Sequence, residues 1–122
     1  MPELSQGVRC DVYKVEGTNR IVVAPIGHWT IDSARPAIDA FRGLLSEGPA
    51  HFVGDCRRMD GYDGEVRAAW QQTFLARRGQ ILSFTFVGVR SSFIRMGIAA
   101  MSLFVEAPMK TVAELDGLRA LE

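Results

Sequence analysis

The segment His51–Trp70 constrains the fold more than any other part of this chain. Within it, a short apolar run ends at Asp55, a polar loop with glycine follows, and a helix is predicted to begin near Asp63. The same order recurs where the apolar run Ile81–Val89 gives way to Arg90. Strands that end in a polar loop before a helix form the functional edge of open α/β sheets. The sequence therefore predicts an α/β fold with two such strand ends at one edge.

The first part of the chain predicts a β-hairpin. Val8–Val15 alternates between apolar and polar residues, which is typical of a half-exposed strand, and Ile21–Ile26 is a continuous apolar run beyond a turn. Pro25 lies inside the second run and cannot donate a ladder hydrogen bond, so we expect a bulge or a strand end near it.

Strands and helices alternate in the rest of the prediction. The first expected helix is capped by Asp32 or Ser33, has Pro36 in its first turn and ends at Gly48, and a buried strand follows over Ala50–Asp55. The second is capped by Asp63, has Arg77 and Arg78 in its last turn and ends at Gly79, and a buried strand follows over Ile81–Val89. The prediction ends with a helix from Ser91 or Ser92 to about Met101, a short strand around Leu103–Val105 and a final helix over Val112–Leu121. This order predicts one domain over residues 1–122, with a mixed, mostly parallel sheet of about five strands, an N-terminal hairpin and about four helices.

Composition narrows the function classes. Fourteen Lys and Arg residues balance fourteen Asp and Glu residues, so no net field favours nucleic acid or an anionic membrane. The apolar stretch Ile94–Val105 is interrupted by Arg95 and is too short to span a bilayer. The polar start of the chain is unlike a signal peptide, and Cys10 and Cys56 form no zinc pattern. We expect a cytoplasmic protein with reduced thiols, no membrane insertion and no nucleic-acid partner.

Catalytic and metal sites have weak support in the sequence. Cys56 follows a strand end, but a nucleophilic thiol needs a base, and only His28 could reach it through the fold because His51 points to the opposite face of its strand. Asp55, Asp60 and Asp63 would make an incomplete magnesium site, and a cap or an ion pair is the simpler role for each carboxylate. We expect no enzyme activity, no metal and no cofactor.

Among the polar residues, four arginines give the most information about a binding site. Arg57 and Arg58 follow one predicted strand, whereas Arg90 and Arg95 follow its neighbour, beside the backbone amides of Ser91 and Ser92. Guanidinium groups beside a helix N-terminus suit a phosphate, a carboxylate or an acidic loop of a partner. The simpler alternative, which we favour, is local ion pairing with Asp55, Asp60 and Asp63.

The segment Phe93–Phe104 is apolar nearly all round, with Phe93, Met96 and Met101 among its exposed candidates. Such a helix is either buried or half-buried against a partner, and methionines suit adaptable interfaces. This pattern predicts an interface with a second copy of the chain or with another protein.

The chain resembles the STAS domain, a family named for sulphate transporters and anti-sigma-factor antagonists, and in particular its stand-alone bacterial members. The resemblance rests on the opening hairpin and on the segments VGDCRRMDGYDG, FTFVGVRSSFIRMGIAAM and LFVEAPMKTVAEL. It implies that the loop after the third strand meets a partner protein, often a kinase-like anti-sigma factor, and that phosphorylation of a serine at the next helix switches this contact.

This sequence departs from the family at the switch. No serine or threonine lies between Asp60 and Gly64, and Tyr62 or Asp63 occupies the position that the resemblance assigns to phosphorylation. A carboxylate near a helix N-terminus is favoured by about 0.3–1 kcal/mol, so we expect at most a fixed, phosphate-like state in place of the switch.

The leading hypothesis is a non-catalytic regulatory or scaffold domain that acts through protein contact, without a serine switch. Its expected contact residues are Arg57, Arg58, Asp60, Tyr62, Asp63, Arg90, Ser91, Ser92 and Arg95, with Phe93, Met96 and Met101 at the apolar interface. The alternative is a small-ligand module that holds a lipid-like or anionic molecule, with an apolar body and an acidic head, between the final two helices and the arginines.

Overall fold

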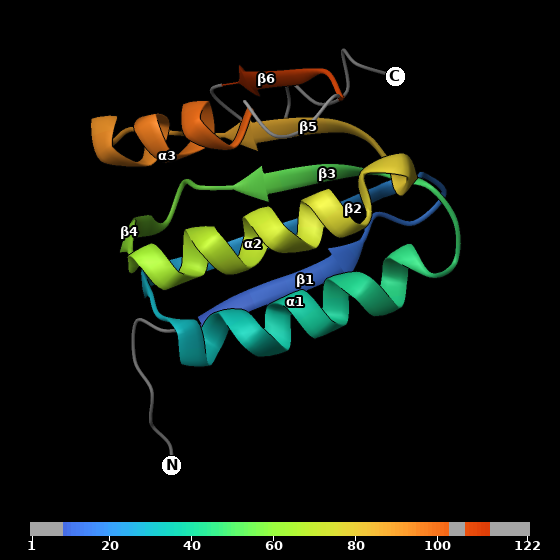
Figure 1. The fold of residues 1–122 in the computed structure, drawn as a ribbon, viewed down its shortest axis with the longest axis horizontal. Helices are drawn as coiled ribbons and strands as arrows, with labels where there is room; N and C mark the ends of the chain where they lie inside the picture. Colours follow the sequence, from blue (N-terminus) through green and yellow to red (C-terminus); the bar gives the residue numbers. More distant parts are fainter. Residues whose placement is uncertain (1–8, 103–106, 113–122) are drawn as a thin grey trace.

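The computed structural model describes residues 9–102 and 107–112 of the chain (Figure 1). Its elements, in chain order, are β1 (Arg9–Lys14), β2 (Arg20–Trp29), α1 (Ile31–Leu45), β3 (Ala50–Asp55), β4 (Met59–Tyr62), α2 (Gly64–Ala76), the 3-10 helix η1 (Arg78–Gln80), β5 (Ile81–Val87), α3 (Ser92–Ser102) and β6 (Met109–Val112).

The sheet has the strand order β1-β2-β3-β5-β6, and β4 pairs with β2 outside this path. β1 runs antiparallel to β2, and all other neighbouring strands are parallel. The predicted α/β fold, the N-terminal hairpin and the mixed, mostly parallel sheet are therefore confirmed. The described residues contain three α-helices, and the predicted fourth helix falls almost entirely on residues 113–122, outside the description.

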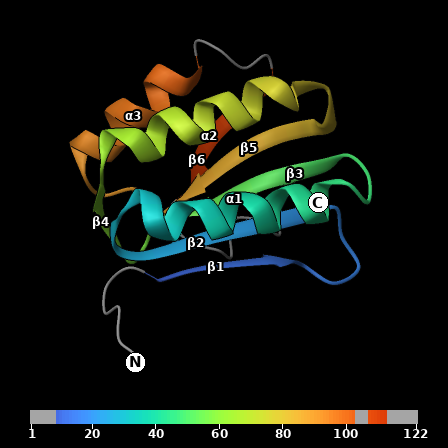
Figure 2. The same ribbon diagram turned by 60° about the horizontal axis from the view of Figure 1, so that its bottom comes forward.

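The core lies mainly on the face of the sheet that the helices cover. α1 and α2 lie side by side across this face (Figures 1 and 2), and buried residues of α3 join the same cluster. Phe52 of β3 is at its centre, with its ring centroid 5.0 Å from that of Phe74 and 5.7 Å from that of Trp70. A second cluster of Val22, Val53 and Val87 is buried on the opposite face. Burial on both faces explains why the central strands are continuous apolar runs.

β2 extends beyond the predicted strand. It continues past Pro25 to Trp29, and its register shifts between Gly27 and His28, where it leaves β1 and pairs with β4. Gly27 has a φ of 83°, a conformation that glycine adopts without steric cost. The predicted irregularity is thus present just after Pro25. β4 itself lies in the segment that the sequence predicted to be a loop, because pairing with β2 stabilises residues of low strand propensity.

The first helix begins earlier than predicted. Thr30, not Asp32 or Ser33, is its N-cap, and the Thr30 side chain accepts a hydrogen bond from the Ser33 amide. Thr30 retains extended backbone angles at the end of β2, which places it one step before the helix. Pro36 therefore lies inside the helix, beyond its first turn, and the prediction for it is wrong.

The second helix has the predicted start but a different end. Asp63 is its N-cap residue without a side-chain capping bond. Arg77 is the C-cap and Arg78 begins η1, so the prediction that both lie in the last helical turn is wrong. The chain tightens into a 3-10 turn there, as helix ends commonly do.

Near the C-terminus the structure corrects two more boundaries. β5 ends at Val87, not Val89, because Gly88 has a φ of 67° and turns the chain. Val112 lies in β6 beside β5, so the predicted helix does not begin there; the next residues, like the strand predicted at 103–105, lie outside the described residues.

Candidate functional site

The ends of β3 and β5 meet at one edge of the sheet. Asp55 lies opposite Val87 in the parallel ladder, and the Cys56 amide donates a hydrogen bond of 2.8 Å to the Val87 carbonyl. A Cβ atom built on Gly88 would collide with the side chain of Arg57. The loop after β3 and the loop after β5 are therefore in direct contact.

Asp55 and Arg57 form a two-pronged ion pair at this edge. The Arg57 guanidinium donates to the carboxylate from Nε to Oδ1 at 2.9 Å and from Nη2 to Oδ2 at 2.8 Å. Burial alone would raise the pKa of Asp55, but the hydrogen bonds and charge of Arg57, with the charge of Arg58, lower it below its ordinary value. The expected local pairing of the arginines is thus present for Arg57.

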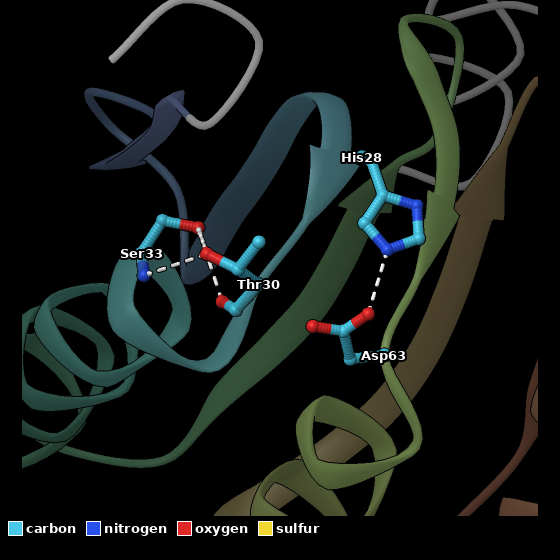
Figure 3. A network of polar contacts seen from close by, with 4 residues as sticks. All are labelled: His28, Thr30, Ser33 and Asp63. Carbon is cyan, nitrogen blue, oxygen red and sulfur yellow. Dashed lines mark hydrogen bonds and ion pairs between the residues drawn. The ribbon is translucent and has the colours of Figure 1, made fainter. Parts of the chain in front are cut away.

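Asp63 pairs with a histidine instead of an arginine. Figure 3 shows His28 directed toward Asp63, and its Nε2 lies 2.8 Å from the Asp63 Oδ1. The Asp63 amide donates to the Trp29 carbonyl at 3.0 Å, which holds the start of α2 beside the end of β2. This pair was not predicted. Its two residues are far apart in the sequence, and only the unpredicted strand β4 brings them together.

Four other predicted polar residues are exposed at the same edge. Arg58 and Asp60 lie in the loop and strand after β3, Arg90 follows β5, and Arg95 lies in α3, where its Nη2 donates to the Val89 carbonyl at 3.1 Å. Within residues 9–102 and 107–112, none of these four side chains forms a salt bridge. Local pairing is therefore incomplete.

The two serines lie at the start of α3. Ser91 precedes the helix, its hydroxyl accepts from the Ile94 amide at 3.4 Å and its carbonyl accepts from the Arg95 amide at 3.0 Å. Ser92 is the first residue of α3 and is exposed. Ser91 thus satisfies part of the helix end itself.

The residues of α3 that were predicted to form an interface differ in their exposure. Met96 is 67% exposed, whereas Met101 is half-buried and packs against the core. Phe93 lies in α3, but the structure does not describe its side chain. Tyr62 is also half-buried, and a Cβ atom on Gly97 would collide with its hydroxyl, so glycine permits the close contact between α3 and β4.

We use the name edge surface for the exposed or half-buried residues gathered here. They are Arg57, Arg58, Asp60, Asp63, Arg90, Ser91, Ser92, Arg95 and Met96.

An apolar cavity of about 60 Å³ lies between the sheet, α2, β4 and α3. Its lining residues are Val23, Pro25, Trp29, Phe52, Gly54, Cys56, Met59, Tyr62, Val66, Arg67, Trp70, Phe74, Phe86, Ile94, Gly97, Ile98 and Met101. The Nε1 atoms of Trp29 and Trp70 are buried and have no hydrogen-bond acceptor among the described residues. A buried donor without a partner costs about 1–3 kcal/mol. Sequence patterns did not predict this cavity.

The chemistry of Cys56 argues against a nucleophilic role. Its thiol is buried and lies 3.8 Å from the Gly54 carbonyl, and burial, assisted by the charge of Asp55, raises its pKa to about 12. A reactive cysteine needs a lowered pKa and an adjacent base. His28, the candidate base that the sequence left for Cys56, is bonded to Asp63.

Two negative findings apply to the described residues. No set of three or more His, Cys, Asp or Glu side chains is arranged to hold a metal ion, and Asp55 and Asp63 are paired with Arg57 and His28. None of the described helices has the length and apolar character needed to cross a membrane.

The fold matches solved structures of a SpoIIAA-like, or STAS-like, fold. One is the crystal structure of a protein from Shewanella loihica PV-4, described as an uncharacterized member of the DUF3478 family with a SpoIIAA-like fold. The two structures superimpose with a TM-score of 0.74 at 13% sequence identity, over 100% of this chain and 99% of that chain. No family model and no curated protein matches the sequence. The comparison establishes the fold that the resemblance to STAS domains implied.

Proposed function

We propose that this protein is a non-catalytic regulatory or scaffold domain that binds a partner protein through the edge surface. The observation that carries the proposal is the position of Arg58, Arg90 and Arg95. All three are exposed at the joined ends of β3 and β5, and none forms a salt bridge with another described residue. A SpoIIAA-like fold is compatible with such a role.

The side chains favour a partner that presents carboxylates beside an apolar group. Guanidinium groups bind carboxylates through paired hydrogen bonds, and three of them here form no salt bridge with a described residue. Met96 adds an exposed, flexible apolar side chain on the neighbouring helix. A partner loop that carries Asp or Glu next to a hydrophobic residue fits both features.

The contact is proposed to work without a serine phosphorylation switch. Residues 60–64 contain no serine or threonine, and Asp63 places a permanent carboxylate at the start of α2. Its bond to His28 fixes this charge in position. Binding is then controlled by the presence of the partner and not by a kinase at this helix.

Charge reversal tests the proposal. Tagged wild-type protein and the variants Arg58→Glu and Arg95→Glu are expressed in cells of the native host, and captured proteins are quantified by mass spectrometry. The matched control is Arg35→Glu, which reverses an exposed arginine of α1 away from the edge surface. We expect each edge variant to lose the main partner about tenfold, because a buried charge pair becomes a like-charge contact.

The control decides the outcome of this experiment. The Arg35→Glu variant is expected to capture the same partner as the wild type. Equal capture by all four proteins would remove the edge surface from the proposal.

A second copy of the chain is one possible partner, and a sizing measurement distinguishes it. If two copies pair through α3, purified protein elutes as a dimer and Met96→Glu converts it to a monomer, because a charge replaces an apolar contact. A monomeric wild-type protein would assign the surface to a different protein.

A further inference from the structure

A groove between α1 and α2 is a feature that the proposed function does not use. The two helices lie side by side across the sheet (Figures 1 and 2), and one face of each lines a space of about 510 Å³. We call this space the helix groove. Its volume falls in the range of roughly 300–1,000 Å³ that is typical of small-molecule sites. The helix groove shares no residue with the edge surface.

We propose that the helix groove binds an elongated small molecule that carries an anionic group, such as a carboxylate, at each end of an apolar chain. The charge of the lining is the first reason. Three arginines, Arg35, Arg42 and Arg77, line the groove, against the single carboxylate of Asp39 among the described lining residues. An excess of guanidinium groups favours an anion, and carboxylates and phosphates match their hydrogen-bond geometry.

These arginines are available to a ligand. Within residues 9–102 and 107–112, neither Arg35 nor Arg77 forms a salt bridge. Arg42 lies beside Asp39, with 3.7 Å between Nη1 and Oδ1, and both side chains are exposed. An exposed pair of this kind contributes little to stability. A ligand can therefore bind the arginines without breaking a strong contact.

The positions of the arginines favour a ligand with two separated charges. β2 and β3 are parallel and each leads into a helix on the same face of the sheet, so α1 and α2 run in the same direction (Figure 1). Arg42 is in the last turn of α1 and Arg77 is the C-cap of α2, so both lie toward one end of the groove. Arg35 lies two turns earlier in α1, about 10 Å away along the helix axis.

The part of the groove between these ends has an apolar floor. Ile38 is 5% exposed, Ala69 is half-buried, and both line the groove. The Thr73 hydroxyl donates to the Ala69 carbonyl at 2.8 Å, so it is already engaged within α2. Contact with this floor removes apolar surface from water, which favours a hydrocarbon chain between the two anionic groups.

Three probes separate the two charges from the chain that joins them. Azelate is an unbranched chain with a carboxylate at each end, and its extended length matches the spacing of Arg35 and Arg42. Nonanoate has as many carbon atoms but a single carboxylate, and succinate has both carboxylates on a much shorter chain. We expect azelate to bind about tenfold more tightly than either control, because it alone reaches both ends of the groove. Saturable shifts of the Ile38, Ala69 and Ala76 amide signals in ¹H–¹⁵N spectra measure each affinity.

Four variants assign the binding to the groove. Arg35→Gln and Arg77→Gln each remove one charge and should lower the affinity for azelate about tenfold, to that of nonanoate. The matched control is Arg78→Gln, which changes the exposed arginine next to Arg77 that does not line the groove, and it should bind azelate as the wild type does. Asp39→Asn removes the competing carboxylate and should raise the affinity severalfold, a gain that damage to the fold would not produce.

The outcomes separate this proposal from the proposed function. Equal affinity for azelate and nonanoate, or an equal loss in Arg78→Gln and Arg77→Gln, would overturn the site. Arg35→Glu is expected to lose azelate binding and still capture the protein partner, whereas Arg95→Glu should do the reverse. Failure of partner capture would therefore leave the helix groove standing, and failure of azelate binding would overturn the helix groove and leave the edge surface standing.

Discussion

The edge surface and the cavity differ in how their polar groups are satisfied. At the edge, Asp55 is bonded to Arg57 and Asp63 to His28, while the remaining arginines are solvated at little cost. In the cavity, the indole groups of Trp29 and Trp70 are buried away from water, and no described residue accepts from them. The edge, where exposed charges can exchange water for a partner, is therefore the surface that we propose for protein contact, whereas the cavity is an apolar gap in the core packing.

The largest effect on stability is expected at Trp70, whose ring packs in the core and whose buried N–H has no acceptor among the described residues. The ring of Trp70 lies 5.5 Å from that of Phe74 and 5.6 Å from that of Phe41. Trp70→Ala should lower the free energy of unfolding by about 3–5 kcal/mol. Trp70→Phe keeps a ring and removes the unpartnered N–H, so it should cost less than about 1.5 kcal/mol. Urea denaturation measures both, and equal losses would show that ring packing is not what Trp70 contributes.

The reactivity of the two thiols tests how well the core around them is shielded from solvent. Burial raises the pKa of Cys56, and also that of Cys10, to about 12. At pH 8 we expect iodoacetamide to alkylate both thiols roughly a thousandfold more slowly in the folded protein than in urea, because the thiolate is the reactive form. Rapid alkylation of Cys56 in the folded protein would contradict its position in the cavity wall.

A smaller effect is expected from the ion pair at the edge. The pKa of Asp55 is lowered in the folded state, so its ionised form stabilises the protein above the ordinary aspartate pKa. That contribution is lost as pH falls through the lowered pKa of Asp55. At neutral pH, Asp55→Asn should cost about 1–3 kcal/mol in urea denaturation, and the difference from wild type should shrink in strong acid.

The exposed Asp60 provides the matched control for this ion pair. Asp60→Asn removes a carboxylate that forms no salt bridge with a described residue, so it should leave stability nearly unchanged at either pH. A difference between Asp55→Asn and wild type that stayed constant with pH would contradict the paired carboxylate.

The smallest effect on stability is expected at the contact between the loop after β3 and the loop after β5. Gly88 has a φ of 67°, and a side chain there would also press on Arg57. Gly88→Ala should cost about 1–2 kcal/mol, whereas Gly79→Ala, where the added carbon meets open space, should change stability far less. Thermal unfolding of the two variants makes the comparison, and equal stability would show that the two loops do not meet at Gly88.

The sequence predicted the elements whose stability comes from their own residues. The predicted strand Ala50–Asp55 is present, the predicted strand Ile81–Val89 is present as Ile81–Val87, and α3 begins at Ser92, one of its two predicted starts. Because β3 and β5 are parallel neighbours, the prediction that polar residues meet at their ends followed from strand order alone.

The remaining features depend on tertiary contacts that a local pattern does not contain. β4 includes Asp60 and Gly61 and is a strand because β2 pairs with it. The His28–Asp63 bond depends on that pairing, so it was missed together with β4. The cavity arises from how side chains of several elements fill space around Gly54 and Gly97, which no hydrophobic pattern predicts.

Amide hydrogen exchange of the protein bound to its captured partner tests the edge surface most directly. The account predicts slower exchange on binding for residues 56–62 and 90–96, with no change along α1 (Ile31–Leu45). Slower exchange confined to α1, with the joined loops unchanged, would contradict it.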